Sequence, residues 1–345
     1  MLQKMLSERE LPKLLERSEM LEILQEEVYG RMPQAPDSIE FKVQENVIPN
    51  FCAGKAVCNK VVAECTIGDK TFCFPFYATM PTDGKKHPFF VHINFREDVP
   101  DRYQPTEELV DNGFAVLSFG YNDVTKDNDD FTDGLAGVLY ENGIRNGNDA
   151  GKIAMWAWAA QRVMDYAEGL SDVLDLNCAV ACGHSRLGKT ALLTAATDER
   201  FTFAYSNDSG CSGAAITRKK QGETVEKICN QFPYWFCENY KKYIGNEENM
   251  PFDQHYLVAS IAPRYVLIGS ASEDLWADPV SEFLCCVAAS SAFKKGFVHE
   301  NRLPEIGDEF FAGDIGYHLR KGLHYIGRED WNKLIKFVNM HKDAV

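Results

Sequence analysis

Short apolar runs alternate with helix-like segments along most of the chain. Helices are expected at 149–170, where alanine, methionine and tryptophan fill the centre, and at 329–341. Strands that alternate with helices form βαβ units, so the pattern predicts an α/β fold. Its central sheet would be mostly parallel and flanked by helices, as in a three-layer αβα sandwich. The expected strands of that sheet are 87–95, 114–120, 178–183, 201–207, 265–271 and 314–320.

The first 80 residues follow a different pattern. Apolar residues recur at helical spacing until Gly30 and Pro33, so residues 1–38 are expected to form an N-terminal helical extension. Three β-rich segments between 39 and 79 are separated by turns and indicate an antiparallel edge to the sheet. The remaining chain, 39–345, is expected to be one α/β domain with a cap-like insertion at about 218–250.

Composition narrows the classes of partner. With 51 acidic and 36 basic residues the formal net charge is −15, which argues against nucleic acid or an anionic membrane as the main partner. No apolar run approaches the roughly 20 residues of a membrane helix. The amphipathic N-terminus mixes both charges, unlike a secretory signal, and the 11 cysteines show no CxxC spacing. We therefore expect a reduced, cytoplasmic protein with buried thiols.

The segment 183–190, Gly-His-Ser-Arg-Leu-Gly-Lys-Thr, follows an apolar strand and opens a helix. It formally matches the GxxxxGK[ST] P-loop, in which backbone N–H groups hold phosphates. However, bulky residues fill positions that favour small ones, and no later apolar strand ends directly in an aspartate for magnesium. A P-loop nucleotide-binding protein therefore remains the alternative interpretation.

The same turn also fits a nucleophile elbow, although the usual GxSxG pattern has its second glycine one position earlier. A serine nucleophile needs a base, and the base needs an orienting acid. In this fold the acid and then the histidine follow the serine along the chain. His324 follows the last expected strand, Asp208 follows 201–207, and Glu273 and Asp274 follow 265–271. These positions lie at strand carboxyl ends, where open α/β sheets place their sites.

Several motifs in this order resemble the glucuronoyl esterases, carbohydrate esterases of the α/β-hydrolase superfamily. Residues 183–189 are similar to their Gly-Cys-Ser-Arg-x-Gly-Lys motif, with His184 in place of the cysteine. Residues 207–213 (NDSGCSG) resemble Gln-Glu-Ser-Gly-x-Gly-Gly, and 232–236 (FPYWF) resemble Phe-Pro-x-Trp-Phe. The resemblance covers roughly 85–341 and extends to acetyl xylan esterase-like hydrolases.

The resemblance implies a role for each matching residue. Ser185 would be the nucleophile, His324 the base and Arg186 an oxyanion residue, its backbone N–H serving as in any α/β-hydrolase. Lys189 would bind substrate, with a solvated first-turn lysine as the alternative. Trp235 would stack on a sugar, with packing in the core as the alternative.

The triad acid stays open among three carboxylates. General α/β-hydrolase order favours Asp274, with Glu273 beside it. The resemblance favours Asp208, where the family usually has glutamate, because the surrounding Ser-Gly context matches. We prefer Asp208.

The combined interpretation is a serine esterase that hydrolyses an acetylated sugar or a glucuronoyl ester through an acyl-enzyme. It needs no cofactor, and its partner is a small carbohydrate ester. The other histidines show no metal-ligand spacing, and the acidic run 123–133 lacks the EF-hand glycine and glutamate, so no metal is expected and that run should be a solvated loop. Further alternatives are a catalytically silent hydrolase fold used for binding, and a peptidase or lipase on the same fold.

Overall fold

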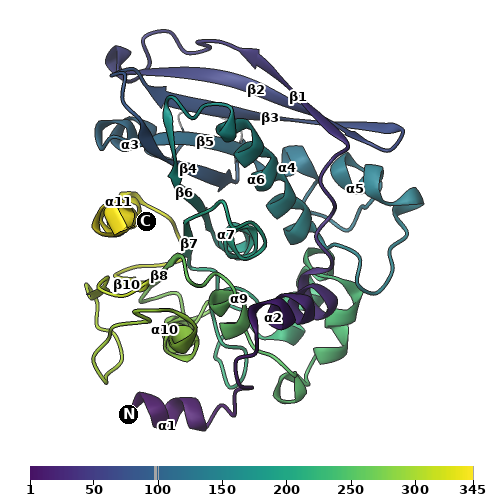
Figure 1. Ribbon diagram of the computed structural model, residues 1–345. Coiled ribbons are helices and arrows are strands. Elements are labelled where there is room, and N and C mark those ends of the chain that lie inside the picture. Colours follow the sequence, from purple (N-terminus) through teal and green to yellow (C-terminus); the bar gives the residue numbers. More distant parts are fainter. Residues whose placement is uncertain (97–98, 100, 345) are drawn as a thin grey trace.

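The computed structural model describes residues 1–96, 99 and 101–344. One ten-stranded sheet runs through the molecule in the order β1-β2-β3-β5-β4-β6-β7-β8-β10-β9 (Figure 1). The strands are β1 (Ser38–Gln44), β2 (Ala56–Ile67), β3 (Lys70–Pro81), β4 (His87–Asn94), β5 (Ala115–Gly120), β6 (Leu174–His184), β7 (Phe203–Asn207), β8 (Tyr265–Ala271), β9 (Glu309–Phe310) and β10 (Ile315–Arg320).

The sheet has the expected mixture of strand directions. All neighbouring pairs from β5 through β4, β6, β7 and β8 to β10 are parallel, and all six strands coincide closely with the predicted runs. The segments predicted as an antiparallel edge form β1, β2 and β3, which extend the sheet beyond β5. The short β9, which the sequence pattern did not indicate, closes the other edge against β10.

Helices cover both faces of the sheet, which confirms the three-layer prediction (Figure 1). One face packs against α6, α7 and α10, and the buried Trp156 and Trp158 belong to that core. The other face packs against α3 and α11, with Trp331 at its centre. The helices are α1 (Leu2–Ser7), α2 (Arg17–Leu24), α3 (Thr106–Asp111), α4 (Tyr121–Val124), α5 (Gly134–Leu139), α6 (Lys152–Glu168), α7 (Arg186–Thr197), α8 (Val225–Gln231), α9 (His255–Ala259), α10 (Pro279–Ala289) and α11 (Arg328–His341).

The N-terminal helices α1 and α2 follow the predicted periodicity, and the segment between them lies against the core of the α/β domain. His255 donates from Nε2 to the Pro12 carbonyl at 2.9 Å, and Tyr256 donates its hydroxyl to the Lys13 carbonyl at 2.7 Å. The insertion after β7 contains α8 and a short 3₁₀ turn, η4 (Pro233–Trp235). The 3₁₀ turn and α8 supply one wall of the pocket described below.

Two further expectations concern thiols and membranes. All 11 cysteines lie in the described part of the chain and are free, and Cys73 alone among them is exposed, which confirms the expectation of buried thiols. No helix within the described residues has the length and apolarity that a membrane span requires.

Candidate active site

The Ser185 turn has the backbone of a nucleophile elbow. Ser185 stands between β6 and α7 with φ +59° and ψ −126°, a strained conformation for a residue other than glycine. Its N–H donates to the Asn207 carbonyl at 2.8 Å, which fixes the turn to the end of β7.

Two glycines allow α7 to pack this closely. A Cβ at Gly183 would lie 2.2 Å from the Leu187 carbonyl oxygen, and one at Gly188 would lie 2.9 Å from Ser206 Oγ. Position 188, one residue later than the second glycine of GxSxG, is thus a place where α7 lies against the Ser206 side chain with no room for a Cβ.

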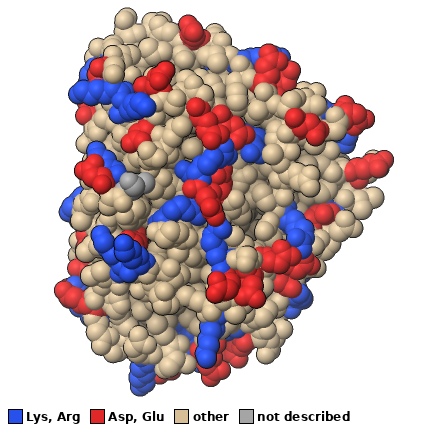
Figure 2. Space-filling view, in the orientation of Figure 1, with Lys and Arg blue, Asp and Glu red and all other residues tan. Residues whose placement is uncertain are grey.

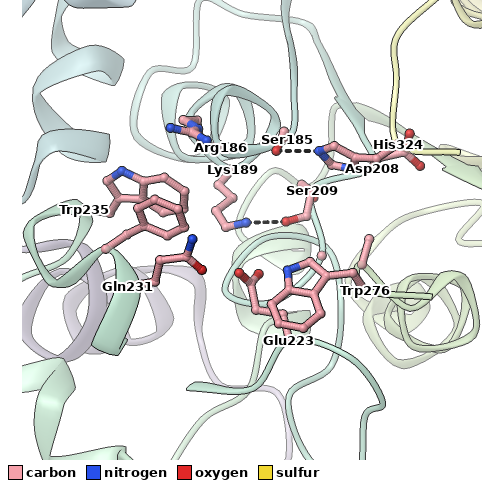
Figure 3. Close-up of a pocket in the computed structure, with 13 residues that line it drawn as sticks. Ser185, Arg186, Lys189, Asp208, Ser209, Glu223, Gln231, Trp235, Trp276 and His324 are labelled. Atoms are coloured by element: carbon pink, nitrogen blue, oxygen red, sulfur yellow. Dashed lines mark hydrogen bonds between the residues drawn. The ribbon is translucent and has the colours of Figure 1, made fainter. Parts of the chain in front are cut away.

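Ser185, His324 and Asp274 form a continuous chain of hydrogen bonds. The Ser185 hydroxyl donates to His324 Nε2 at 2.8 Å, as Figure 3 shows, and His324 Nδ1–H donates to Asp274 Oδ2 at 2.6 Å. Asp274 follows β8, and its other oxygen accepts the Ala277 N–H at 3.2 Å. Burial alone would raise the pKa of Asp274, but the hydrogen bond and charge of His324 lower it below its usual value. An ionised carboxylate, an oriented imidazole and a serine hydroxyl can together carry out acyl transfer.

We expected Asp208 to accept the hydrogen bond from His324. In the structure, Asp274 accepts it. Asp208 is 1% exposed, and its two oxygens are used elsewhere. Oδ1 accepts the Ala271 N–H at 2.7 Å, and Oδ2 accepts a hydrogen bond from Arg320 at 3.1 Å. The preference for Asp208 over Asp274 is therefore wrong for this contact. Glu273 contributes its backbone N–H to the Gly322 carbonyl at 2.9 Å.

Asp208, Asp274 and His324 are also the group of described residues that could geometrically hold a metal ion. One ligand atom from each lies within 4.8 Å of the others. The same side chains are already engaged: Asp208 bonds Arg320, and His324 bonds both Asp274 and the serine.

A pocket of about 420 Å³ opens beside Ser185. Lys189 lies at its wall rather than in solvent, being 3% exposed, and its ammonium donates to the Ser209 carbonyl (Figure 3). Burial lowers the pKa of Lys189. Glu223 and Gln231 line the same pocket, so its lining includes an ammonium, a carboxylate and an amide side chain.

Two tryptophans lie on opposite sides of the pocket in Figure 3. Trp235 is 3% exposed, and its ring stacks on Phe232 at 3.9 Å between centroids and 1° between planes. The packing alternative therefore describes Trp235 better than sugar stacking does, although Trp235 is one of the residues that line the pocket. Trp276 is 48% exposed and also lines the pocket. Trp276 belongs to none of the motifs described above, and its place two residues after Asp274 was the available signal.

Arg186 is held by an acidic residue of the 123–133 segment, which we expected to be a solvated loop. Its guanidinium pairs with Asp127 and lies over the Trp235 ring at 4.6 Å. Asp127 also accepts hydrogen bonds from Trp235 Nε1 at 2.7 Å and the Tyr121 hydroxyl at 3.0 Å. The prediction of a solvated loop is thus wrong at Asp127. Arg186 is also the first residue of α7, so its backbone N–H has no acceptor within the helix.

The chain is similar to known esterases over most of its length. The family model described as "Glucuronyl esterase, fungi" matches residues 63–296. A carbohydrate esterase from an unknown prokaryotic organism is 39% identical over 240 residues, which cover 68% of this chain and 55% of that relative. A 4-O-methyl-glucuronoyl methylesterase of Schizophyllum commune is 26% identical over 297 residues, covering 83% of this chain and 69% of that protein. The chain thus spans little more than half the length of the first of these relatives.

Solved structures of esterases are also similar to this chain over most of its length. A promiscuous CE15 esterase from a marine bacterial metagenome superposes with a TM-score of 0.84 at 30% identity, covering 94% of this chain and 91% of that one. A glucuronoyl esterase from Solibacter usitatus has a TM-score of 0.84 at 31% identity with the same coverage of 94% and 91%. With a family model that matches more than half of its residues, this chain belongs to the glucuronoyl esterase family of the α/β-hydrolase fold.

Proposed function

We propose that the protein is a serine esterase that cleaves carboxylic esters of carbohydrates, with a glucuronoyl ester as substrate. The observation that carries the proposal is the Ser185–His324–Asp274 chain, with hydrogen bonds of 2.8 Å and 2.6 Å, beside a pocket that Ser185 and His324 line. The names of the relatives, a carbohydrate esterase and a 4-O-methyl-glucuronoyl methylesterase, support the substrate class.

The first half of the reaction transfers the acyl group to the enzyme. Ser185 Oγ attacks the ester carbonyl carbon while His324 Nε2 takes its proton, and Asp274 stabilises the resulting imidazolium. The Arg186 N–H, which has no acceptor within α7, donates a hydrogen bond to the oxyanion, and the Arg186 guanidinium adds positive charge. The intermediate then collapses, the bond to the alcohol oxygen breaks, and His324 protonates that oxygen. In the second half, water attacks the acyl carbonyl and loses a proton to His324. The second intermediate then collapses, its bond to Ser185 Oγ breaks, and His324 returns the proton to that oxygen while the carboxylic acid leaves.

The pocket lining supports a hydroxyl-rich substrate. An ammonium group has three donors, and Lys189 uses one of them on the Ser209 carbonyl. The Glu223 carboxylate and the Gln231 amide line the same pocket and can bind sugar hydroxyls. The exposed Trp276 ring, which lies across the pocket from Trp235 in Figure 3, offers an apolar surface of the kind on which sugars stack.

The test uses a methyl 4-O-methylglucuronate ester and a fluorophosphonate. The wild type should release methanol from the ester and gain one covalent adduct, mapped to Ser185 by peptide mass analysis. Ser185→Ala should lose both activities while remaining folded, whereas Ser209→Ala, which changes the other serine of the pocket, should still be labelled. A folded wild type that neither hydrolyses the ester nor reacts with the fluorophosphonate would refute the proposal.

A further inference from the structure

A buried arginine lies directly behind the loop that carries His324. Arg320 is the last residue of β10 and is 6% exposed. Its Nε donates to both oxygens of Asp330, at 2.8 Å and 2.9 Å, and its Nη2 donates to Asp208 at 3.1 Å. The guanidinium therefore connects the end of β10 with β7 and with the first turn of α11.

The same guanidinium bonds the backbone on both sides of His324. Nη2 donates to the Leu323 carbonyl at 3.1 Å and to the Tyr325 carbonyl, and Nη1 donates to the Lys321 carbonyl at 3.4 Å. The residues immediately before and after the imidazole are thus attached to one rigid group. Arg320 itself is not among the described residues that line the pocket.

The loop that carries Asp274 is attached at the same place. The Ser272 N–H donates to the Arg320 carbonyl at 2.9 Å, and the Glu273 N–H donates to the Gly322 carbonyl at 2.9 Å. These two bonds continue the parallel pairing of β8 with β10 beyond the strand ends. Both partners of the 2.6 Å bond between His324 and Asp274 therefore depend on the backbone around Arg320.

We propose that Arg320 is a positioning residue that holds the His324 loop in the geometry in which the imidazole reaches both Ser185 and Asp274. The inference rests on the proposed function and extends it to a residue that touches neither the substrate nor the reacting atoms. Asp330 fixes the position of the Arg320 guanidinium. Its carboxylate also accepts the Gly327 N–H at 2.8 Å and a hydrogen bond from the Asn207 amide at 3.1 Å.

Only arginine has the donors that this arrangement needs. A guanidinium presents five N–H groups in a planar fork, whereas a lysine ammonium is a single point with three donors. A lysine at position 320 would keep the charge between Asp208 and Asp330 but could not bond both carboxylates and the Leu323 and Tyr325 carbonyls together. Displacement of a catalytic group by about 1 Å can cost about 100-fold in rate.

The test measures how fast a fluorophosphonate labels Ser185, a reaction that needs the serine and histidine but no sugar recognition. We expect Arg320→Lys to lower the labelling rate constant about 10- to 100-fold, and to lower kcat for the ester by a similar factor with KM within about twofold. Arg302→Lys is the matched control, because Arg302 also bonds two acidic side chains and a loop carbonyl but lies outside both catalytic loops. It should be labelled at the wild-type rate.

A folded Arg320→Lys variant that is labelled within twofold of the wild type would overturn the inference, and so would a rise in KM at unchanged kcat. If Arg320→Lys does not fold, Asp330→Asn decides, since it removes the charge that anchors the guanidinium and should also slow labelling. An unlabelled wild type would refute the proposed function itself, so the two failures are distinguishable.

Discussion

Asp274 and His324 make the 2.6 Å hydrogen bond that completes the serine–histidine–carboxylate chain. Asp208, whose carboxylate lies in the same small cluster, is instead neutralised by Arg320 at 3.1 Å. Burial raises the pKa of Asp208, whereas the contact with His324 holds the pKa of Asp274 below its usual value despite burial. The two carboxylates near the imidazole therefore have different roles. Asp274 orients His324, and Asp208 belongs to the hydrogen-bond network of Arg320.

This division predicts unequal effects of two isosteric changes. Asp274→Asn should lower kcat by about 10³- to 10⁴-fold, because the imidazolium loses its counter-charge and the favoured tautomer. Asp208→Asn should cost less than about tenfold, since the asparagine oxygen can still accept the Ala271 N–H. Steady-state kinetics of ester hydrolysis measure both. The reverse order of the two effects would place the triad acid at Asp208.

A second prediction concerns the ion pair between Asp127 and Arg186. Removing an oxyanion donor typically costs about 10²- to 10³-fold in kcat, which we expect for Arg186→Met. Asp127→Asn keeps an acceptor for Trp235 Nε1 but removes the charge that holds the guanidinium, and should cost about tenfold. If Asp127 acts through Arg186 alone, the double variant should be no slower than Arg186→Met. Fully additive losses in kcat would show that Asp127 has a separate role.

The third prediction tests substrate recognition by Lys189. Lys189→Met preserves the length of the buried stem and removes the donors that face the pocket. KM for the uronate ester should rise at least about tenfold, while kcat/KM for p-nitrophenyl acetate, which has no hydroxyl groups, should change less than about threefold. Lys336→Met, which alters an exposed lysine of α11 that pairs with Glu309 of β9, serves as the control. Equal losses on both esters would mean that Lys189 supports the elbow rather than the sugar.

The strands and the serine–histidine pair could be predicted because local sequence determines them. Buried parallel strands appear as short apolar runs, and open α/β sheets place functional groups at strand carboxyl ends. Ser185 and His324 follow such runs, as does Asp274. The helices expected at 149–170 and 329–341 are likewise present, as α6 and α11.

The acid and the oxyanion support could not be assigned in the same way, because distant residues decide them. Arg320, which takes the charge of Asp208, stands 112 residues further along the chain. Asp127 reaches Arg186 across 59 residues from a polar loop whose composition is that of an ordinary solvated segment. In both cases the deciding partner is brought in by the tertiary fold, so neither strand pattern nor motif context could identify it.

The last prediction concerns stability and pH, and depends on Glu282 in α10. This carboxyl is fully buried, where it accepts the Gly210 N–H at 2.8 Å and the Ser270 hydroxyl at 2.5 Å. Burial raises the pKa of Glu282 from its ordinary 4.5 to about 7. The folded protein therefore binds more protons than the unfolded chain between these values. The contribution of the Glu282 carboxyl to the free energy of unfolding is therefore fully present below about pH 4.5. It is lost as the pH rises through about 7.

Glu282→Gln removes this ionisation and keeps an acceptor in place. We expect the free energy of unfolding of the wild type, measured relative to Glu282→Gln by urea denaturation, to fall by roughly 2 to 3 kcal/mol from about pH 5 to about pH 8. The other ionisable groups are common to both proteins, so most of their contributions cancel in this difference. Glu226→Gln, which changes an exposed glutamate of α8, should show no such trend. A difference between wild type and Glu282→Gln that stays constant over this pH range would show that Glu282 keeps the same protonation state in the folded and unfolded protein.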